Sequence, residues 1–249
     1  MCQNARYFPA GDSALIMELG NEISPAINSR IREIAYMLEN ENIKGIVETV
    51  PTYRSIMVVY DPMLLDYSSL IERLKYLESQ RGKTDIPPAM VTEIPTVYGG
   101  EYGPDIEFVA SHNGVTVEDV VQIHCSTNYL IYMLGFTPGF PYLGGMSERI
   151  AAPRLEVPRE RITAGSVGIA GKQTGIYPIN SPGGWRIIGR TPLKLFDPGR
   201  KEPVLLKAGN YIRFVPVEVE EFKRIEAEVE ESRYCARTYP LEEGEDDDF

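Results

Sequence analysis

The sequence predicts an α+β protein in which a ferredoxin-like unit precedes a unit made mainly of short strands. Over the first ninety or so residues, helical and strand patterns alternate in the order β-α-β-β-α-β, which is the ferredoxin-like order. After residue 127 the helical periodicity disappears, and short β-rich runs recur between Gly, Pro and Asn, as in a sandwich or barrel. A chain of 249 residues with 43% hydrophobic residues is long enough to build two such cores.

The first unit is expected to begin with a strand over residues 12–19. Ser24 is a favourable N-cap and Pro25 suits the first helical position, so the apolar residues that follow at helical spacing predict a helix. Two β-rich runs come next, over residues 43–50 and 53–60, and a tight turn joins them.

A second helix is predicted from Ser69 and Glu72, which have the spacing of a capping box before an apolar face. Residues 81–88 have the composition of a linker, and residues 90–98 are the strand that completes the pattern. We therefore assign residues 1–85 to the ferredoxin-like domain.

Two short helices are expected at the start of the second unit. Pro104 can begin one helix and Gly114 can end it, while Thr116 and Asp119 fit the start of the other. Residues 217–232 have the pattern of a charged helix.

The second domain is assigned to residues 90–232. Residues 233–249 end in a run of acidic side chains that repel one another and bury nothing, so we expect an acidic, disordered tail.

The formal net charge of -11 argues against binding to nucleic acid or to an anionic membrane. No apolar run is long enough to span a bilayer, and the N-terminus has no pattern of a signal peptide, which makes the cytoplasm the expected location. Neither the three cysteines nor the two histidines have metal-ligand spacing, so no metal site is expected.

The stretch AGSVGIAGKQTGIYPINSPGGW resembles a phosphate loop, but it fails the pattern of one. If Gly171 and Lys172 were the Gly-Lys pair of a Walker A motif, Ser166 would replace the first glycine and Gln173 the closing hydroxyl. A nucleophile elbow around Ser166 fails as well, because Ala164 stands where that motif needs glycine. Tight corners between barrel strands remain as the interpretation.

Two further features leave alternatives open. The aromatic and proline residues of GFTPGFPYLGGM form either a rigid loop packed on the barrel or the wall of a concave site. A local excess of arginine suits either a small carboxylate or phosphate ligand or salt bridges to nearby glutamates. The arginines concerned are Arg154, Arg159, Arg161, Arg186 and Arg190.

The runs YMLGFTPGFPYLGGM and VPRERITAGSVGIAGKQTGIYPINSPGGWRIIGRTPLKLFDP closely resemble the allophanate hydrolase subunit 1 family, which includes the B subunit of 5-oxoprolinase and the KipI-type kinase inhibitors. The resemblance covers about residues 7–220 and implies a cyclophilin-like β-barrel in the C-terminal part. It implies two partner subunits, one of the KipA type and one of the LamB/YcsF type. Together the three subunits would cleave 5-oxo-L-proline to L-glutamate, and the complex would use ATP. No cofactor intrinsic to this chain is expected.

This function predicts a site for a small anionic amide, although no residue stands out as a catalytic nucleophile. Arginines would contact the anion, polar side chains would hydrogen-bond the amide, and aromatic side chains would form the walls. The expected binding residues are Arg154, Arg161, Ser166, Gln173, Ser181 and Arg190, and the expected walls are Phe136, Pro138, Phe140, Tyr177 and Trp185. Two alternatives remain: a KipI-type inhibitor that binds a sensor histidine kinase, and a component of an allophanate hydrolase or urea carboxylase-like complex.

Overall fold

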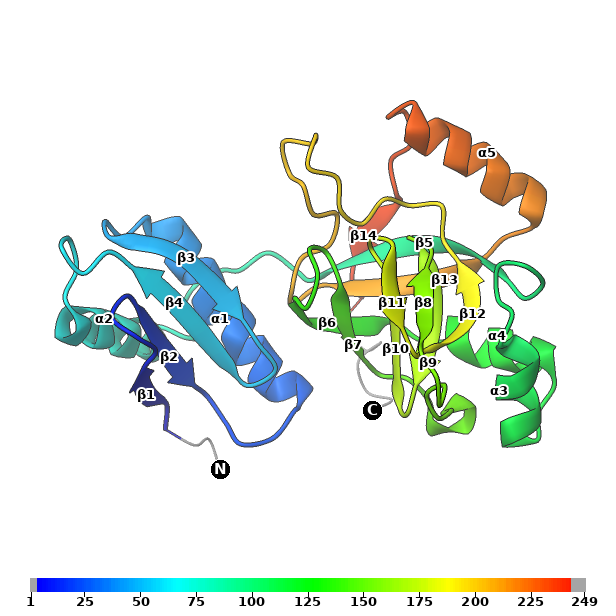
Figure 1. The fold of residues 1–249 in the computed structure, drawn as a ribbon. Coiled ribbons are helices and arrows are strands. Elements are labelled where there is room, and N and C mark those ends of the chain that lie inside the picture. The colour runs from blue at the N-terminus through cyan, green and yellow to red at the C-terminus, as the bar shows by residue number, and fades with distance from the viewer. Residues whose placement is uncertain (1–3, 243–249) are drawn as a thin grey trace. The chain divides into compact units, whose positions relative to one another are not determined.

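The computed structural model describes residues 4–242, and the chain divides into two units at residues 88 and 89 (Figure 1). Each unit has its own cluster of buried hydrophobic side chains. The predicted α+β class is confirmed. No helix among the described residues is long and apolar enough to cross a membrane.

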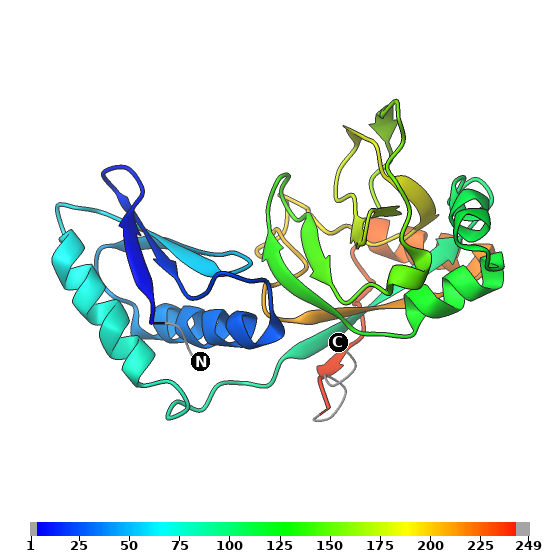
Figure 2. The same ribbon diagram turned by 90° about the horizontal axis from the view of Figure 1, so that it is seen from below.

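The first unit is a four-stranded antiparallel sheet in the order β1-β2-β4-β3. Two helices cover one face of this sheet (Figures 1 and 2). The elements are β1 (Arg6–Pro9), β2 (Ala14–Glu18), α1 (Pro25–Glu41), β3 (Ile46–Pro51), β4 (Ser55–Tyr60) and α2 (Tyr67–Ser79).

The two helices of this unit differ in how well their starts were predicted. Ser24 caps α1 as expected, with its hydroxyl accepting from the backbone N–H of Ile27 at 3.3 Å. The predicted capping box of α2 is wrong, because Asp66 caps the helix earlier. The Asp66 carboxylate accepts from two successive backbone N–H groups, those of Ser68 and Ser69, and also from the Ser69 hydroxyl.

The ferredoxin-like assignment needs one correction, since the strand over residues 90–98 does not join the first sheet. That place, beside β2, is taken by β1, which pairs with β2 across a short turn closed by the bond from Ala10 N to Ala14 O. A hairpin of neighbouring residues closes a much shorter loop than a strand beyond the linker would, so its entropic cost is smaller. The unit keeps the ferredoxin-like sheet but takes its last strand from the N-terminus.

The second unit is an eight-stranded sheet in the order β10-β9-β12-β5-β13-β6-β7, with β14 also paired to β5. Strands β10 and β7, at the two ends of this path, are in contact, so the sheet is nearly closed into the implied barrel. The strands are β5 (Met90–Tyr98), β6 (Tyr129–Leu134), β7 (Pro141–Gly144), β9 (Ser166–Ala170), β10 (Gln173–Ile176), β12 (Arg186–Arg190), β13 (Tyr211–Pro216) and β14 (Thr238–Pro240).

A separate two-stranded sheet, β8 (Arg159–Ile162) with β11 (Ser181–Gly183), accompanies the barrel. The helices of this unit are α3 (Ile106–Asn113), α4 (Val117–Cys125), the 3-10 turn η1 (Glu148–Ile150) and α5 (Val219–Glu230). Two of the predicted boundaries of the short helices are confirmed: Gly114 ends α3 in the left-handed conformation, and Thr116 with Asp119 forms the capping box of α4. The predicted start at Pro104 is wrong, because Asp105 is the N-cap residue and α3 begins at Ile106.

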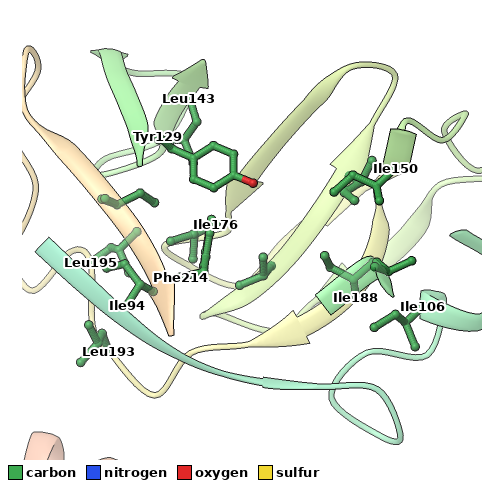
Figure 3. Close-up of a cluster of buried hydrophobic side chains, with 14 of the residues drawn as sticks. Ile94, Ile106, Tyr129, Leu143, Ile150, Ile176, Ile188, Leu193, Leu195 and Phe214 are labelled. Atoms are coloured by element: carbon green, nitrogen blue, oxygen red, sulfur yellow. The ribbon is translucent and has the colours of Figure 1, made fainter. Parts of the chain in front are cut away.

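The barrel interior is packed with side chains from several strands and from α3 (Figure 3). Tyr129 and Phe214 are almost fully buried, and their rings meet edge to face at 5.4 Å. Burying side chains of this kind contributes about 1.5–3 kcal/mol each. The interior of the sheet is therefore filled, and the candidate site is lined by the loop after β5 together with residues of β8, β9 and β12.

The acidic tail was expected to be disordered from residue 233 onward, and this is wrong for residues 238–240. They form β14 and pair antiparallel with β5, where Arg237 also forms an ion pair with Glu93 at 3.0 Å. Residues 243–249, which hold most of the acidic run, lie outside the described residues.

Candidate functional site

A pocket of about 330 Å³ opens on the second unit between the loop after β5 and the strands β8 and β12. Three arginines and one glutamate lie around it, together with several smaller groups. Its lining residues are Glu101, Tyr102, Pro104, Arg159, Arg161, Ile162, Thr163, Ser166, Ile187 and Arg190.

The loop that supplies Glu101 is fixed to β12 by its own backbone. Gly99 N donates to Ile188 O at 3.1 Å, and Asp105 N donates to Ile187 O at 2.9 Å. Gly103 lies so close to β12 that a Cβ atom there would be 2.0 Å from Ile188 O. Only glycine permits this approach, which holds the loop against the pocket.

Arg159 is held in place by a buried carboxylate. Its two terminal nitrogens donate to the two oxygens of Asp105, at 2.8 and 2.9 Å. Asp105 Oδ2 also accepts from Ile187 N at 2.7 Å, so the same carboxylate ties the arginine to β12. A bidentate pair of this kind fixes both the position and the plane of the guanidinium group.

Arg190 is also fixed, whereas Arg161 is not. Arg190 Nε donates to Ala164 O at 3.1 Å, and a terminal nitrogen lies 3.9 Å from Glu226. The Arg161 side chain is exposed and forms no hydrogen bond or ion pair within residues 4–242. The pocket thus combines two positioned guanidinium groups with one whose donors are all available to a ligand.

A cluster of aromatic rings lies next to the pocket. Phe140 is its centre, with edge-to-face contacts to Phe136, Tyr142, Tyr177 and Trp185 at centroid distances of 5.3–6.0 Å. The two features are joined through the backbone, because Tyr177 N donates to Ser166 O at 2.9 Å. Arg159 also donates to Trp185 O at 3.4 Å.

Phe136, at the edge of this cluster, is unusual in two respects. Its side chain is 79% exposed, and its backbone has a φ of +66°, which side chains other than glycine rarely adopt. Such strain persists only where the surrounding structure imposes it, and it is common at binding sites.

His124 lies inside the barrel rather than in the pocket. Thr174 Oγ1 donates to Gly168 O at 3.1 Å, so it accepts from His124 Nε2 at 2.8 Å. The other ring nitrogen, Nδ1, is then the acceptor for the Tyr98 hydroxyl at 2.7 Å. Burial lowers the pKa of His124 to about 3, which keeps the ring neutral. No group of three or more potential metal-ligating side chains occurs in the part of the chain that the structure describes.

Residues 5–206 match the family model of the carboxyltransferase domain, subdomains C and D. The chain belongs to this family.

Relatives within the family extend over most of the chain. The B subunit of 5-oxoprolinase from Bacillus subtilis is 43% identical over 224 residues, which are 85% of this chain and 92% of that protein. The crystal structure of the conserved uncharacterized protein PH0987 from Pyrococcus horikoshii is 51% identical, with a TM-score of 0.52, and covers 87% of this chain and 100% of that one. The Kluyveromyces lactis urea amidolyase is 24% identical with a TM-score of 0.71, covers 95% of this chain and 16% of that one, and shares the fold.

The structure brings part of the predicted site together and separates the rest. Arg161, Ser166 and Arg190 line one pocket, and Ser166 is buried there. The predicted wall residues gather beside it in the aromatic cluster, except for Pro138, which is exposed on the same loop. The residues outside both features are Arg154, Gln173 and Ser181.

Sequence reasoning missed the wall that the loop after β5 provides, including Glu101 and Tyr102. The run YGGEYGPD contains three glycines, and Gly103 is the one that approaches another backbone closely. Only a helix start at Pro104 was predicted from this run. Arg159 was noticed only as part of the arginine excess. Its role depends on Asp105, 54 residues earlier, which no local pattern indicates.

Proposed function

We propose that the chain is the B subunit of an ATP-dependent 5-oxoprolinase, which opens the ring of 5-oxo-L-proline to give L-glutamate. The observation that carries this proposal is the 43% identity to the corresponding Bacillus subtilis protein over nearly the full length of both chains. The proposed partners are one subunit of the LamB/YcsF type and one of the KipA type.

The pocket suits the binding of the substrate carboxylate. 5-Oxoproline carries a carboxylate, and the arginines around the pocket supply the donors that a carboxylate requires. The lining residues include the hydroxyls of Thr163 and Ser166 but no histidine or cysteine that could activate a nucleophile. We therefore assign substrate binding to this chain, and activation of the lactam by ATP to the assembled complex.

The test is to purify the chain alone and together with its LamB/YcsF-type and KipA-type partners, and to measure ATP hydrolysis and glutamate formation with 5-oxoproline. We expect activity only when all three proteins are present. Activity in none of the mixtures would contradict the proposal and favour the kinase-inhibitor alternative.

Within the active complex, Arg161→Gln tests the pocket. We expect the KM for 5-oxoproline to rise about tenfold or more, because a charge-assisted contact to the carboxylate is lost. The matched control is Arg149→Gln, which removes an exposed arginine of η1 outside the pocket. An unchanged KM in Arg161→Gln would place the carboxylate elsewhere.

Phe136 is the proposed contact with one of the partner proteins. An exposed aromatic side chain on a constrained loop is a common anchor of protein interfaces. We expect Phe136→Ala to weaken co-purification with the partners while the far-UV circular dichroism stays that of the wild type. Assembly at wild-type affinity would exclude this contact.

A further inference from the structure

Glu101 and Arg161 carry opposite charges, line the same pocket and do not pair with each other. Within residues 4–242 neither of them forms an ion pair or a hydrogen bond to any side chain. The other two arginines of the pocket differ in this respect, since Arg159 is paired with Asp105 and Arg190 lies near Glu226. Among the described residues that line it, the pocket therefore holds one free anion and one free cation.

These free groups come from different walls. Glu101 is on the loop fixed to β12 by the close approach of Gly103, whereas Arg161 is on strand β8. The cationic side is reinforced by the two positioned arginines, while Glu101 is the only acidic residue among the described residues that line the pocket. A ligand that only carries negative charge gains from the arginines but gains nothing from Glu101.

We propose that Glu101 is a specificity-determining residue that accepts a hydrogen bond from an N–H group of the bound ligand. The ligand class is a small molecule with a carboxylate and an N–H group, that is, an α-amino acid or its lactam. The carboxylate binds the arginines, and the N–H group donates to Glu101. This inference rests on the proposed function, in which both the lactam N–H of the substrate and the ammonium group of the product have this character.

Two ligands that differ only in the N–H group measure how much the hydrogen bond to Glu101 contributes to the binding free energy. In 5-oxotetrahydrofuran-2-carboxylate, a ring oxygen replaces the N–H of 5-oxo-L-proline, while the carboxylate and the ring size are kept. Isothermal titration of both ligands is carried out on the full chain alone and on the complex with its partner proteins. A hydrogen bond to a charged group favours the donor by about tenfold or more.

We expect the wild type to bind the lactam about tenfold more tightly than the lactone. In Glu101→Ala this ratio should fall to about one, because the affinity for the lactam drops while that for the lactone is unchanged. Glu101→Gln, which keeps a neutral acceptor, should give an intermediate ratio. Arg161→Gln should weaken both ligands equally, and Glu107→Gln, an exposed carboxylate on α3 outside the pocket, should change neither.

A wild-type ratio that persists in Glu101→Ala would overturn the inference, and so would a failure of both ligands to bind to either preparation. Neither result affects the turnover test of the proposed function, which depends on activity with the partner proteins. Conversely, a preference for the lactam that disappears in Glu101→Ala would support the inference even if no mixture hydrolysed ATP.

Discussion

Asp105 is buried and determines the position of two of the groups that line the pocket. It accepts two hydrogen bonds from Arg159 and one from the backbone of Ile187. Its partners are separated from it in sequence by 54 and 82 residues, so the carboxylate links the loop after β5 to β8 and β12.

Asp105→Asn should destabilise the second unit by about 2–3 kcal/mol, because an amide NH₂ would then face the guanidinium donors in a buried place. The measurement is urea denaturation followed by the fluorescence of Trp185, the only tryptophan in the chain. The control is Glu148→Gln, which breaks the exposed pair with Lys172 and should cost less than about 1 kcal/mol. Equal costs for the two variants would contradict the proposed role of Asp105.

His124 should make stability depend on pH. Its pKa is about 3 in the folded protein and about 6.5 when unfolded, so below pH 6.5 the unfolded state binds more protons. Its contribution is complete above pH 6.5 and is lost as the pH falls toward 3. The stability difference between wild type and His124→Gln, measured by urea denaturation, should shrink by about 2 kcal/mol between pH 8 and pH 5. A difference that stays constant would refute this.

At the scale of single residues, the sequence predicted which residue types line the pocket better than it predicted which residues they contact. Of the three arginines that line the pocket, Arg161 and Arg190 were among the predicted binding residues, and whether they bind an anion stays a prediction. The partner of Arg159 could not be predicted, because Asp105 lies 54 residues earlier in the sequence and meets it only in the folded barrel. Gln173 was expected in the site for its amide, but it begins β10 in an exposed position.

At the scale of elements, the glycines of the stretch over residues 164–185 have different roles. Gly165 has a φ of +84°, and a Cβ atom there would lie 2.3 Å from Thr191 O. Gly171 also has a positive φ, of +59°, but has nothing within 4 Å of the Cβ position in the turn between β9 and β10. Backbone conformation requires both glycines, and packing requires only the first.

Gly165→Ala should therefore lower the free energy of unfolding by about 2–4 kcal/mol, from backbone strain combined with the contact to Thr191. Gly171→Ala should cost about 1 kcal/mol, from the left-handed conformation alone. Thermal or urea denaturation of both variants measures the difference. If the two substitutions cost the same, the close approach of Gly165 to Thr191 is not a constraint.

Helix starts were predictable where a single side chain accepts a hydrogen bond from a free backbone N–H group of the first turn, as at Ser24 and Thr116. They were not predictable where two candidates compete. Ser69 has capping-box spacing, but the Asp66 carboxylate is the stronger acceptor and begins the helix earlier. The partner of strand 90–98 was missed for another reason, since strand order depends on contacts across the whole chain.

At the scale of the whole molecule, separate cores predict separate unfolding. Leu74 is completely buried in the core of the first unit, so Leu74→Ala should destabilise that unit by about 2–5 kcal/mol. The far-UV circular dichroism transition should then split or broaden. The transition of Trp185 fluorescence, which reports only on the second unit, should keep its midpoint. A shift of that midpoint would show that the two units unfold together.

Strand β5 follows the linker directly, yet its partners are β12, β13 and β14, each of which lies far along the chain. During synthesis, the strand in the middle of the sheet therefore leaves the ribosome long before anything that can pair with it. The first unit can fold at once, whereas residues 90–98 have no strand to pair with until β12 has been made at residue 190, and they lack β13 until residue 216. Long-range pairing of this kind is slow and exposes chains to aggregation, so the second unit is where dependence on chaperones should be greatest.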